Sequence, residues 1–511
     1  MVGKVYLIGA GPGDPELITL RGRRRLAEAD LVLYDALIHP DVLGYARADA
    51  ERVFVGKRAG HPSERQHRID ERMLEAARAG RVVARLKGGD PFLFGRGSEE
   101  AEHLFLAGIP FEVVPGVPSP VAATAYAGIT LTHREHSSSV AYVTATESRE
   151  KDESSHDWGK LATATSTLVI FMGMRKLASL MQLLVDHGRS PDAPAAVVQW
   201  ASLPAQRTVI GTVGDIAERA ADAGLGLPAL TIVGEVVAHR EALRWFEGRP
   251  LFGKRVLVTR PEHQQASVSQ LLADEGAEAV RAAAIRIEGP SDPGPLRDAV
   301  ADARAYRWVV FTSANGVAAF FGEVDRQGLD ARILGAARVA AIGPATQDAL
   351  RARGVRADVM PDEFVGEGAA EAVIAADPDL RGARVLLPRA EVARMALPDR
   401  LREVGAEVDV VSAYRTVSAT AEDAARIREL VTTAQVDVLT FTSPSTVREV
   451  AAALGDAEPA LLTGDLVVAC IGPVTAQAAK ERGWPVHVVA DDYTAEGLVA
   501  ALRAYYTSGE P

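Results

Sequence analysis

The sequence predicts an α/β protein built in two halves, and three observations lead to this prediction. Short apolar runs such as 31–34 and 167–171 alternate with Ala- and Arg-rich stretches of helical character. The segment 241–254 contains glycine and proline residues typical of a linker. Beyond it, four short landmarks recur at a constant spacing, which indicates an internal duplication. We therefore expect one half over 1–240 and another over 255–505.

The composition is that of a globular protein without a strongly basic surface. Of the 511 residues, 48% are hydrophobic and 24% are charged, and 56 Lys and Arg against 68 Asp and Glu give a net charge of −12. This charge argues against an extended nucleic-acid surface. Cys470 is the only cysteine, which excludes an intramolecular disulfide and a cysteine-based zinc cluster.

The sequence predicts neither a signal peptide nor a membrane span. The apolar run 5–10 is too short for the core of a signal peptide. The longest uncharged run, 113–132, contains three prolines and two glycines, so it predicts a buried loop followed by a helix. We expect a cytoplasmic protein that contacts neither a membrane nor nucleic acid.

In the first half, strands and helices are expected to alternate. A strand over 4–10 leads through a Gly/Pro turn into a helix over 16–29. The further predicted strands cover 31–34, 82–86, 139–144, 167–171, 195–199 and 230–233. The polar, aperiodic stretch 146–160 predicts a surface loop.

The turn after the first strand, Gly9-Ala-Gly-Pro-Gly-Asp14, has the glycines of a ligand-binding turn. Glycine allows a tight turn and a close approach of the backbone to a ligand. The third glycine is misplaced for the dinucleotide motif G-x-G-x-x-G, and Pro12 interrupts the turn where backbone N–H groups should hold a pyrophosphate. The turn therefore disfavours a nicotinamide nucleotide.

A second glycine-rich segment, 85–100, also follows a predicted strand. Gly88-Gly89 would let a ligand lie against the backbone, and Asp90 offers a carboxylate to ribose hydroxyls or to an amine. Arg96 and Glu99 stand where the loop meets the next helix. The alternative is an ordinary turn, in which the acidic residues only favour a helix N-terminus.

Together these segments resemble uroporphyrinogen-III C-methyltransferase. The motifs occur in that family's order from 1 to about 240: GAGPGDP (9–15), GGDPFLFGRGSEE (88–100), Pro115-Gly116, 125–129, 132–134 and 171–173. The resemblance implies two α/β lobes with a cofactor cleft between them. It also implies two methyl transfers from S-adenosylmethionine to C2 and C7 of uroporphyrinogen III, giving precorrin-2, and a homodimer formed through this half.

The family's cofactor positions carry over, by resemblance, onto nine residues. They are Pro12, Gly88, Gly89, Asp90, Leu93, Met172, Ala201, Pro228 and Ala229. This chain has Pro118-Ser119 where the family has Thr-Ala or Thr-Ser, so the hydroxyl at 118 is lost and Ser119 alone remains. Ala145-Thr146 replaces a Gly-His pair, and Pro62, with His61 beside it, replaces a histidine. That histidine either matters for methyl transfer or is only structural.

The resemblance also assigns the chemistry of the first half. A sulfonium methyl is already electrophilic, so alignment with the attacking pyrrole carbon supplies the rate, and we expect no metal and no metal-ligand spacing of His or Cys. The carboxylate-rich substrate needs a basic clamp, for which Arg96 and Arg134 are candidates, with Lys57 and Arg58 further out. Arg96, paired with Glu99, would orient the ring and help a proton leave, unless a substrate carboxylate or water takes that proton. The alternative role of Arg134 is a surface ion pair.

The second half contains the duplication. The matching pairs are 255–260 with 384–389, 275–278 with 404–407, 311–313 with 441–443, and 342–346 with 471–475. The Ser and Thr at these strand-to-helix turns are either anion sites at helix N-termini or ordinary N-caps. Arg260, Arg389 and Arg415 add positive charge near strand ends. A ligand would most naturally lie between the two copies.

This half resembles uroporphyrinogen-III synthase, on motifs at 258–261, 311–317, 341–346, 441–447 and 471–476. The resemblance implies closure of hydroxymethylbilane with inversion of ring D and loss of water, without a cofactor. It implies two α/β domains joined by two strands, one combining 252–285 with 418–505 and the other covering 286–415. Tyr414 matches the family's tyrosine proposed to assist departure of the hydroxyl. The alternative is an amphipathic tyrosine at a domain edge, and its partner in the repeat is Ile285.

The two resemblances support each other, because the product of the synthase is the substrate of the methyltransferase. We expect a bifunctional enzyme of sirohaem or cobalamin synthesis, with Arg96, Glu99, Arg134 and Tyr414 as its catalytic residues. One alternative is a different methylase of the same superfamily. Another makes the second half a ligand-binding module without turnover.

Overall fold

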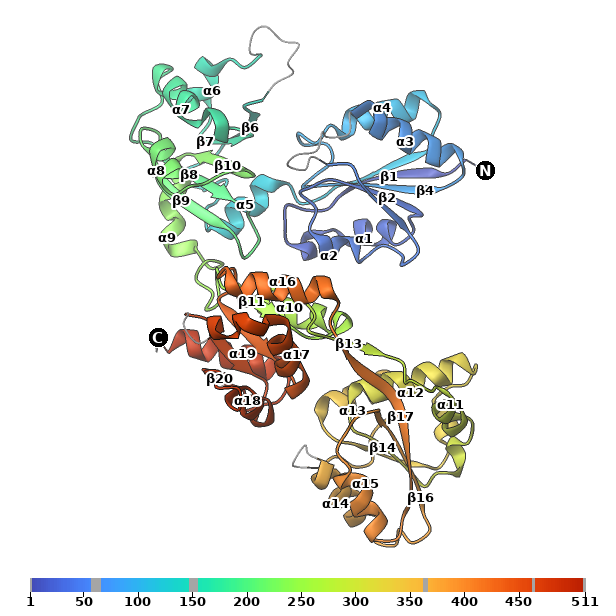
Figure 1. Ribbon diagram of the computed structural model, residues 1–511. Helices are drawn as coiled ribbons and strands as arrows, with labels where there is room; N and C mark the ends of the chain where they lie inside the picture. Colours follow the sequence, from blue (N-terminus) through green and yellow to red (C-terminus); the bar gives the residue numbers. More distant parts are fainter. Residues whose placement is uncertain (1, 57–65, 147–154, 362–365, 462–464, 509–511) are drawn as a thin grey trace. The chain divides into compact units, whose positions relative to one another are not determined.

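The computed structural model describes residues 2–56, 66–146, 155–361, 366–461 and 465–508. The chain divides into two compact units, Met1–Gly253 and Lys254–Pro511. Each unit contains two five-stranded sheets with helices packed on them, which confirms the predicted α/β class (Figure 1). Among the residues described, no helix combines the length and the apolar character needed to cross a membrane.

The first lobe of the first unit is a parallel sheet with the strand order β3-β2-β4-β1-β5. Its strands are β1 (Lys4–Gly9), β2 (Leu31–Tyr34), β3 (Glu51–Phe54), β4 (Val82–Lys87) and β5 (Phe111–Val114). Its helices are η1 (Pro15–Leu17), α1 (Leu20–Leu26), α2 (Pro40–Leu43), α3 (Gln66–Arg78) and α4 (Gly97–Leu106). In Figure 1, α1 and α2 lie on one side of this sheet and α3 and α4 on the other. The central strands β1 and β2 are apolar on both faces, as expected of a parallel sheet that helices cover on both sides.

The helix predicted over 16–29 is interrupted. The hydroxyl of Thr19 accepts the Gly22 N–H at 3.0 Å, so Thr19 caps a new helix, α1, and only the short η1 precedes it.

The second lobe of the first unit is a mixed sheet with the order β6-β7-β10-β8-β9. Its strands are β6 (Val140–Thr144), β7 (Thr167–Phe171), β8 (Pro194–Gln199), β9 (Arg207–Thr212) and β10 (Ala229–Val233). Its helices are α5 (Ser119–Ala127), α6 (Trp158–Ala164), η2 (Met174–Lys176), α7 (Leu177–Asp186), α8 (Ile216–Asp222), η3 (Glu235–His239) and α9 (Arg240–Leu243). The uncharged run 113–132 forms the end of β5, a loop and α5, so the predicted helix is confirmed. The loop was predicted to be buried, but Pro115 is exposed and residues 116–118 are only partly buried.

The segment predicted as a linker, 241–254, lies largely within the first unit. The ring of Phe246 is 3% exposed and packs on Tyr126 with centroids 4.8 Å apart. The indole N–H of Trp245 donates to the Ala125 carbonyl at 3.0 Å. The Gly/Pro punctuation indicated a linker, but these aromatic side chains anchor the segment to α5.

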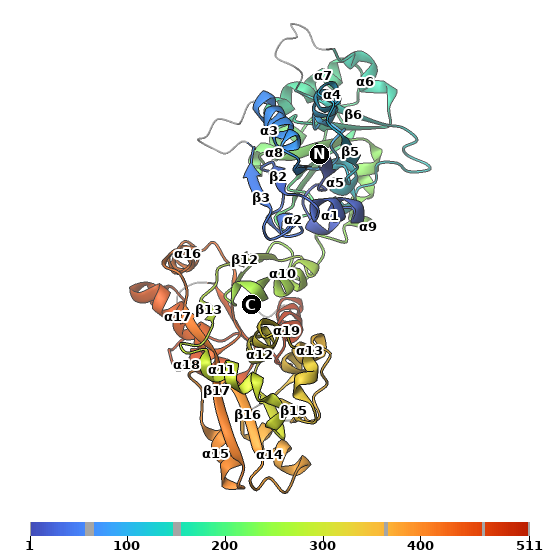
Figure 2. The same ribbon diagram turned by 90° about the vertical axis from the view of Figure 1, so that its right-hand side faces the viewer.

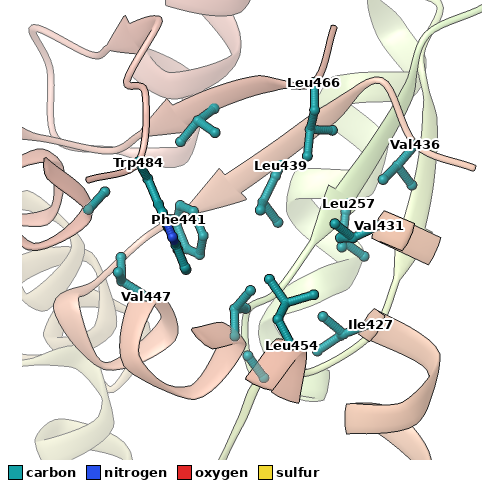
Figure 3. Packing of buried hydrophobic residues seen from close by; sticks show 14 of the residues in the cluster. Leu257, Ile427, Val431, Val436, Leu439, Phe441, Val447, Leu454, Leu466 and Trp484 are labelled. Carbon is teal, nitrogen blue, oxygen red and sulfur yellow. The ribbon is translucent and has the colours of Figure 1, made fainter. Parts of the chain in front are cut away.

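The second unit contains a lobe that is discontinuous in sequence, with the strand order β12-β11-β18-β19-β20. Its strands are β11 (Arg255–Val258), β12 (Glu278–Arg281), β18 (Val438–Phe441), β19 (Val467–Cys470) and β20 (Val488–Val489). Its helices are η4 (Glu262–Gln264), α10 (Gln265–Asp274), α16 (Ala421–Thr432), α17 (Pro444–Leu454), η7 (Gly455–Leu461), α18 (Pro473–Lys480) and α19 (Ala495–Thr507). Figure 3 shows Leu257 of β11 packed with Leu439 and Ile427, which come from the far end of the chain.

The other lobe of the second unit is continuous and has the strand order β13-β17-β16-β14-β15. Its strands are β13 (Ile285–Glu288), β14 (Trp308–Phe311), β15 (Arg338–Ala341), β16 (Arg384–Ala390) and β17 (Glu407–Ser418). Its helices are α11 (Gly294–Ala301), η5 (Ala303–Ala305), α12 (Ala314–Arg326), η6 (Ala331–Leu334), α13 (Pro344–Ala352), α14 (Gly366–Ala376) and α15 (Ala396–Glu403). In both views α14 and α15 lie beside β16 and β17 (Figures 1 and 2).

The duplication is visible in the order of the strands. The repeat-related strands occupy equivalent places, because β12-β11-β18-β19 in one sheet corresponds to β17-β16-β14-β15 in the other. The chain passes between the lobes along β13 and β17, which pair antiparallel, with Ile285 opposite Ser418. The predicted division into 252–285 with 418–505 and 286–415 is therefore confirmed.

Candidate functional site

The two glycine-rich loops of the first unit lie side by side at the carboxyl ends of neighbouring parallel strands. Gly9 at the end of β1 is level with Lys87 at the end of β4. Beyond the strands, the Gly89 N–H donates to the Gly11 carbonyl at 2.7 Å, and the Gly11 N–H donates to Gly89 at 3.3 Å. This edge of an open parallel sheet is where α/β proteins bind ligands.

Two glycines in these loops have opposite surroundings. A Cβ on Gly116 would lie 2.2 Å from the Gly89 carbonyl oxygen, so three backbone segments pack here without room for a side chain. A Cβ on Gly88 would meet only the Cβ of Leu37, at 3.4 Å. The backbone of Gly88 therefore presents an open face on which a ligand could lie.

Asp90 braces the loop that carries it. One carboxylate oxygen accepts the Phe92 N–H at 2.8 Å, and the other accepts the Gly116 N–H at 3.0 Å. Sequence reasoning assigned this carboxylate to a ligand alone. In the structure this carboxylate holds the loop in place. Each oxygen still has a second lone pair with which it could accept a hydrogen bond from a ligand.

A buried ionic network lies beneath the second loop. Glu100 is fully buried, and one of its oxygens accepts hydrogen bonds from Arg85 Nε at 3.1 Å, Lys87 Nζ at 3.0 Å and Gln66 Nε2 at 3.0 Å. Arg85 also donates to Asp35 at 3.0 Å. Burial, together with the nearby Arg85 charge, lowers the pKa of the Lys87 ammonium. Glu100 thus joins the loop to β4 and does more than favour a helix N-terminus.

The loops of the second lobe bring the other predicted cofactor residues to one edge of its sheet. Met172 follows β7, Ala201 follows β8, and Pro228-Ala229 opens β10. Since β10 runs antiparallel to both neighbours, its start lies level with their ends, with Ala229 opposite Gln199. The residues inferred from the resemblance therefore gather in space although they are far apart in sequence.

The loops of the two lobes meet. The Asp14 N–H donates to the Ser202 hydroxyl at 3.1 Å, and the Tyr126 hydroxyl donates to the Asp14 carboxylate at 2.9 Å. The rings of Phe94 and Phe171 approach to 4.7 Å between centroids. Burial and the adjacent Asp14 charge raise the pKa of Tyr126. The sequence analysis did not identify Tyr126 and Ser202, because no pattern in the neighbouring residues indicates a contact between the two lobes.

Strained backbone is concentrated in these loops. Of the six described non-glycine residues with positive φ, five lie here: Phe94 (52°), Arg96 (60°), Met172 (55°), Trp200 (50°) and Ser202 (65°). Such conformations cost of order 1–3 kcal/mol each and persist where the surrounding structure enforces them. The clustering singles out the Gly88–Arg96 loop and the loops after β7 and β8. Together with the Gly9–Asp14 turn, which is hydrogen-bonded to Gly89, they form the candidate cofactor site.

The predicted basic residues differ in their surroundings. Arg96 Nε donates to Glu99 at 3.0 Å, which confirms the expected pair, and both side chains are about half exposed. Arg134 is exposed in the turn that follows α5, and no described carboxylate forms an ion pair with it. Lys57, Arg58, His61 and Pro62 lie outside the described residues.

In the second unit, Tyr414 and Ser313 face each other. The Tyr414 hydroxyl lies 3.0 Å from Ser313 Oγ, which also accepts the Gly316 N–H at 3.0 Å as the N-cap of α12. Tyr414 is only 9% exposed. Its hydroxyl therefore sits at a helix N-terminus, where backbone N–H groups favour negative charge. Ser443 caps α17 in the same way, through Thr446.

Two repeat-related arginines are held in desolvated surroundings. Burial lowers the pKa of Arg260 and that of Arg389. The Nε of Arg260 is buried without a hydrogen-bond acceptor in the described part of the chain. The backbone carbonyl of the same arginine accepts a hydrogen bond from Gln265 Nε2 at 2.8 Å. A buried, unsatisfied guanidinium nitrogen is suited to receive an anion.

A contact joins the lobes of the second unit near these groups. Gln264 Nε2 donates to Asn315 Oδ1 at 2.9 Å, linking η4 to the start of α12. Arg415 instead pairs with Glu288 at 2.9 Å, so its charge is already matched.

Comparisons with known proteins agree with this division. The family model "Tetrapyrrole (Corrin/Porphyrin) Methylases" matches residues 4–217, and "Uroporphyrinogen-III synthase HemD" matches residues 266–500. The "Porphyrin biosynthesis protein HemD" of Ruminiclostridium josui is 36% identical over 500 residues, which cover 98% of this chain and 97% of that protein.

Other relatives match the first half. The siroheme synthase of Neisseria meningitidis serogroup B is 51% identical over 244 residues, 48% of this chain, and the chain spans 50% of the length of that relative. The crystal structure of uroporphyrin III C-methyl transferase from Thermus thermophilus is 42% identical, covers 46% of this chain and 99% of its own, and has a TM-score of 0.40.

Proposed function

The chain belongs to the family that joins a tetrapyrrole methylase to a uroporphyrinogen-III synthase, and from this we propose that it makes precorrin-2 from hydroxymethylbilane. The second unit would close hydroxymethylbilane to uroporphyrinogen III, and the first would methylate this product at C2 and C7. One observation carries the proposal: models of two families whose reactions are consecutive match successive halves of this chain. A relative named as a porphyrin biosynthesis protein is similar along 98% of it.

S-adenosylmethionine is the proposed methyl donor, and it supplies an already electrophilic methyl group. The residues present fit such a ligand, since the Gly88 backbone face is open while Gly89 and Gly116 are tightly packed behind it. Ser119 Oγ lies 3.2 Å from the position of a Cβ on Gly89, beside the glycine loop, and is the hydroxyl proposed to serve in place of the one lost at Pro118. Pro12, Leu93, Met172, Ala201, Pro228 and Ala229 would complete the site.

Arg96 and Arg134 are the proposed clamp for the carboxylates of uroporphyrinogen III. Arg96 has a left-handed backbone conformation, and its guanidinium is paired with Glu99 before substrate arrives. Arg134 keeps its charge available, because no described carboxylate pairs with it. Fixing the macrocycle aligns its nucleophilic carbon, which is the largest contribution these side chains make to the rate.

In the second unit, Tyr414 is the proposed acid that assists loss of the hydroxyl. Ser313, held by the Gly316 N–H, orients the phenol. Arg260 and Arg389 would bind substrate carboxylates, which would satisfy the unpaired Arg260 Nε. We further propose that the enzyme is cytoplasmic and forms a homodimer through its first unit, where Phe105 and Leu106 at the end of α4 are about three-quarters exposed.

Product identification tests the proposal. The full chain is incubated with hydroxymethylbilane, with and without S-adenosylmethionine, and the products are separated by isomer and mass. We expect uroporphyrinogen III without the methyl donor and precorrin-2 with it. Formation of the type I isomer alone would mean spontaneous closure, and the second unit would then be a binding module without turnover. Methylation of a different tetrapyrrole would favour another methylase of the superfamily.

A further inference from the structure

Three histidines gather on the second lobe of the first unit, apart from the glycine-rich loops. His133, His136 and His239 each offer a ring nitrogen, and these three atoms all lie within 4.8 Å of one another. The ring centroids are 4.5–4.9 Å apart, and His133 and His239 are stacked at 10°. The group is accessible, since His136 is exposed and the other two are partly buried.

The backbone beneath two of these side chains is fixed. The His133 N–H donates to the Ser137 carbonyl at 2.8 Å, and the Ser137 N–H donates back at 2.9 Å, which closes a turn with His133 and His136 side by side. Ser137 is 3% exposed, and its hydroxyl lies 2.7 Å from that of Thr167 on β7. The turn is therefore anchored to the sheet.

The third histidine stands on a separate anchored element. His239 ends η3, whose Val236 and Val237 are buried against the same sheet. The Gly234 N–H donates to the Pro194 carbonyl at 2.9 Å, which ties the start of η3 to β8. Two rigid elements separated by about a hundred residues thus present imidazoles to one point.

We propose that His133, His136 and His239 form a binding site for a divalent first-row transition metal ion, of which Zn²⁺ is the best match. Imidazole nitrogen is a preferred ligand of zinc, and three histidines leave a fourth position for water or a carboxylate. Glu135 can supply that carboxylate, because its Oε2 lies 4.0 Å from His136 Nε2.

Binding requires only local movement. Zinc–nitrogen bonds of about 2.0–2.1 Å place tetrahedral ligand atoms about 3.3 Å apart, so the widest pair must close by about 1.5 Å. His136 is exposed, so its ring has room to turn towards the other two. His133 Nδ1 accepts the Glu135 N–H at 3.2 Å, and ligation through Nε2 would shift the ring proton to Nδ1 and give up this long hydrogen bond.

A bound ion would link the 133–137 turn to the segment that leaves the first unit. α9 follows His239 directly, and Trp245 and Phe246 pack on α5 soon afterwards. The site would therefore stabilise the end of the first unit and hold the turn that also carries Arg134, the proposed carboxylate clamp. The sequence showed no metal-ligand spacing, because His133 and His136 are only two of the three histidines and His239 is distant in sequence.

Zinc titration of the full chain tests this site. Chelator-treated protein is titrated with Zn²⁺ in competition with a chromophoric chelator, and Co²⁺ is then added to read the ligand geometry from its absorption. We expect one tight site per chain, a Co²⁺ spectrum typical of tetrahedral coordination, and a higher Tm with Zn²⁺. His239→Gln and His136→Gln should each weaken Zn²⁺ binding at least about thirtyfold and remove the Tm increase.

The matched control is His67→Gln, since His67 is exposed on α3 of the other lobe and pairs with Glu71. This variant should bind Zn²⁺ as the parent chain does. Equal zinc affinity in the parent, His239→Gln and His136→Gln chains would overturn the proposal, as would the absence of a tight site in the parent. Circular dichroism of the metal-free variants verifies their folding, and the exposed position of His136 keeps that variant informative if His239→Gln misfolds.

Discussion

The candidate site of the first unit consists mainly of backbone, whereas that of the second unit consists mainly of side chains. In the first unit the site is made largely of backbone, with packed glycines and five left-handed non-glycine residues. In the second unit, Ala434 is the only described non-glycine residue with positive φ, and the site consists of side-chain groups, Tyr414, Ser313 and two desolvated arginines. The first site should therefore fail when a methyl group is added, and the second when a functional group is removed.

The largest effect is expected from Gly116→Ala. The new Cβ would lie 2.2 Å from the Gly89 carbonyl oxygen, so the loops must separate, at a cost of about 3 kcal/mol in the free energy of unfolding of the first unit. Methylation should disappear while the closure of hydroxymethylbilane by the same chain persists. Urea denaturation and the two activity assays measure this.

The control for that variant is Gly322→Ala. Gly322 lies within α12 and nothing surrounds its Cβ position, so alanine there should be neutral or stabilise by about 0.5–1 kcal/mol. Equal stability of the Gly116→Ala and parent chains would show that the loops are not tightly packed.

Gly88→Ala should separate ligand binding from stability. Its Cβ would meet only Leu37, at 3.4 Å, so the Tm should stay within about 2 °C of that of the parent chain. The same methyl group would stand on the open backbone face, and the affinity for S-adenosylhomocysteine, measured by calorimetry, should fall at least about tenfold. Unchanged affinity would place the cofactor elsewhere, and tight binding of NADH in its place would reject the methyl-donor assignment.

Arg96→Lys should lower methylation about tenfold or more and leave the affinity for S-adenosylhomocysteine nearly intact. Lysine keeps the charge but loses the planar fork that Arg96 presents to Glu99 and to a substrate carboxylate. The measurement is kcat alongside the calorimetric affinity. Turnover within about twofold of the parent chain, well below 1 kcal/mol of barrier, would make Arg96 structural only.

Tyr414→Phe should slow closure of hydroxymethylbilane by about three- to tenfold without loss of fold, because it deletes one hydroxyl and keeps the ring packing. Tyr306→Phe is the matched control. Tyr306 lies in the same lobe, but its hydroxyl donates to Asp409 at 2.8 Å, away from Ser313. Equal rates of closure in the two variants would exclude Tyr414 as the acid, and the buried arginines would then be the groups that act on the substrate. A fragment that begins at about Leu251 should also close hydroxymethylbilane without S-adenosylmethionine. In this fragment, too, Tyr414→Phe should slow the closure and Tyr306→Phe should not.

The smallest effect concerns Glu112 in the first unit. Partial burial opposes its ionisation, but hydrogen bonds from Lys4, Arg21 and Arg25 lower its pKa to about 2. Because this value is below that of an unfolded glutamate, about 4.3, the carboxylate stabilises the fold above that pH, and the gain is lost as the pH falls towards 2. Glu112→Gln should cost about 1 kcal/mol of unfolding free energy at pH 7 and almost nothing at pH 2, as measured by urea denaturation. A cost independent of pH would mean lost packing and not lost charge.

Local features were predictable from the sequence, and long-range partnerships were not. The strand over 167–171 was predicted with its correct bounds because polar residues flank an apolar run. The Arg96–Glu99 pair follows from their spacing of three residues. In contrast, the partners of Lys87 and Arg85 depend on the fold, although two cations on one face of an apolar strand were a visible signal.

The segment 241–254 and the histidine cluster also depend on long-range contacts that the sequence does not indicate. Glycine and proline at 248–253 suggested an unattached connection, yet Phe246 had a hydrophobic partner in Tyr126 that sequence patterns do not indicate. His239 lies far from His133 along the chain, and only the shared sheet brings them together. The role of Tyr414 came from a resemblance, while its contact with Ser313 needed the structure.

The order of the strands in the second unit determines which of its two lobes can fold first during translation. β11 pairs with β18, with Val256 opposite Val438, so the discontinuous lobe cannot close its sheet until the chain beyond 441 has emerged. The continuous lobe, 286–415, is complete earlier and can fold while β11 waits with one edge bare, a state prone to strand-to-strand association. Translation that stops before β18 would therefore leave a folded lobe attached to an unpaired strand edge. The part of the chain from β18 onward, about its last seventh, thus protects the nascent protein from aggregation.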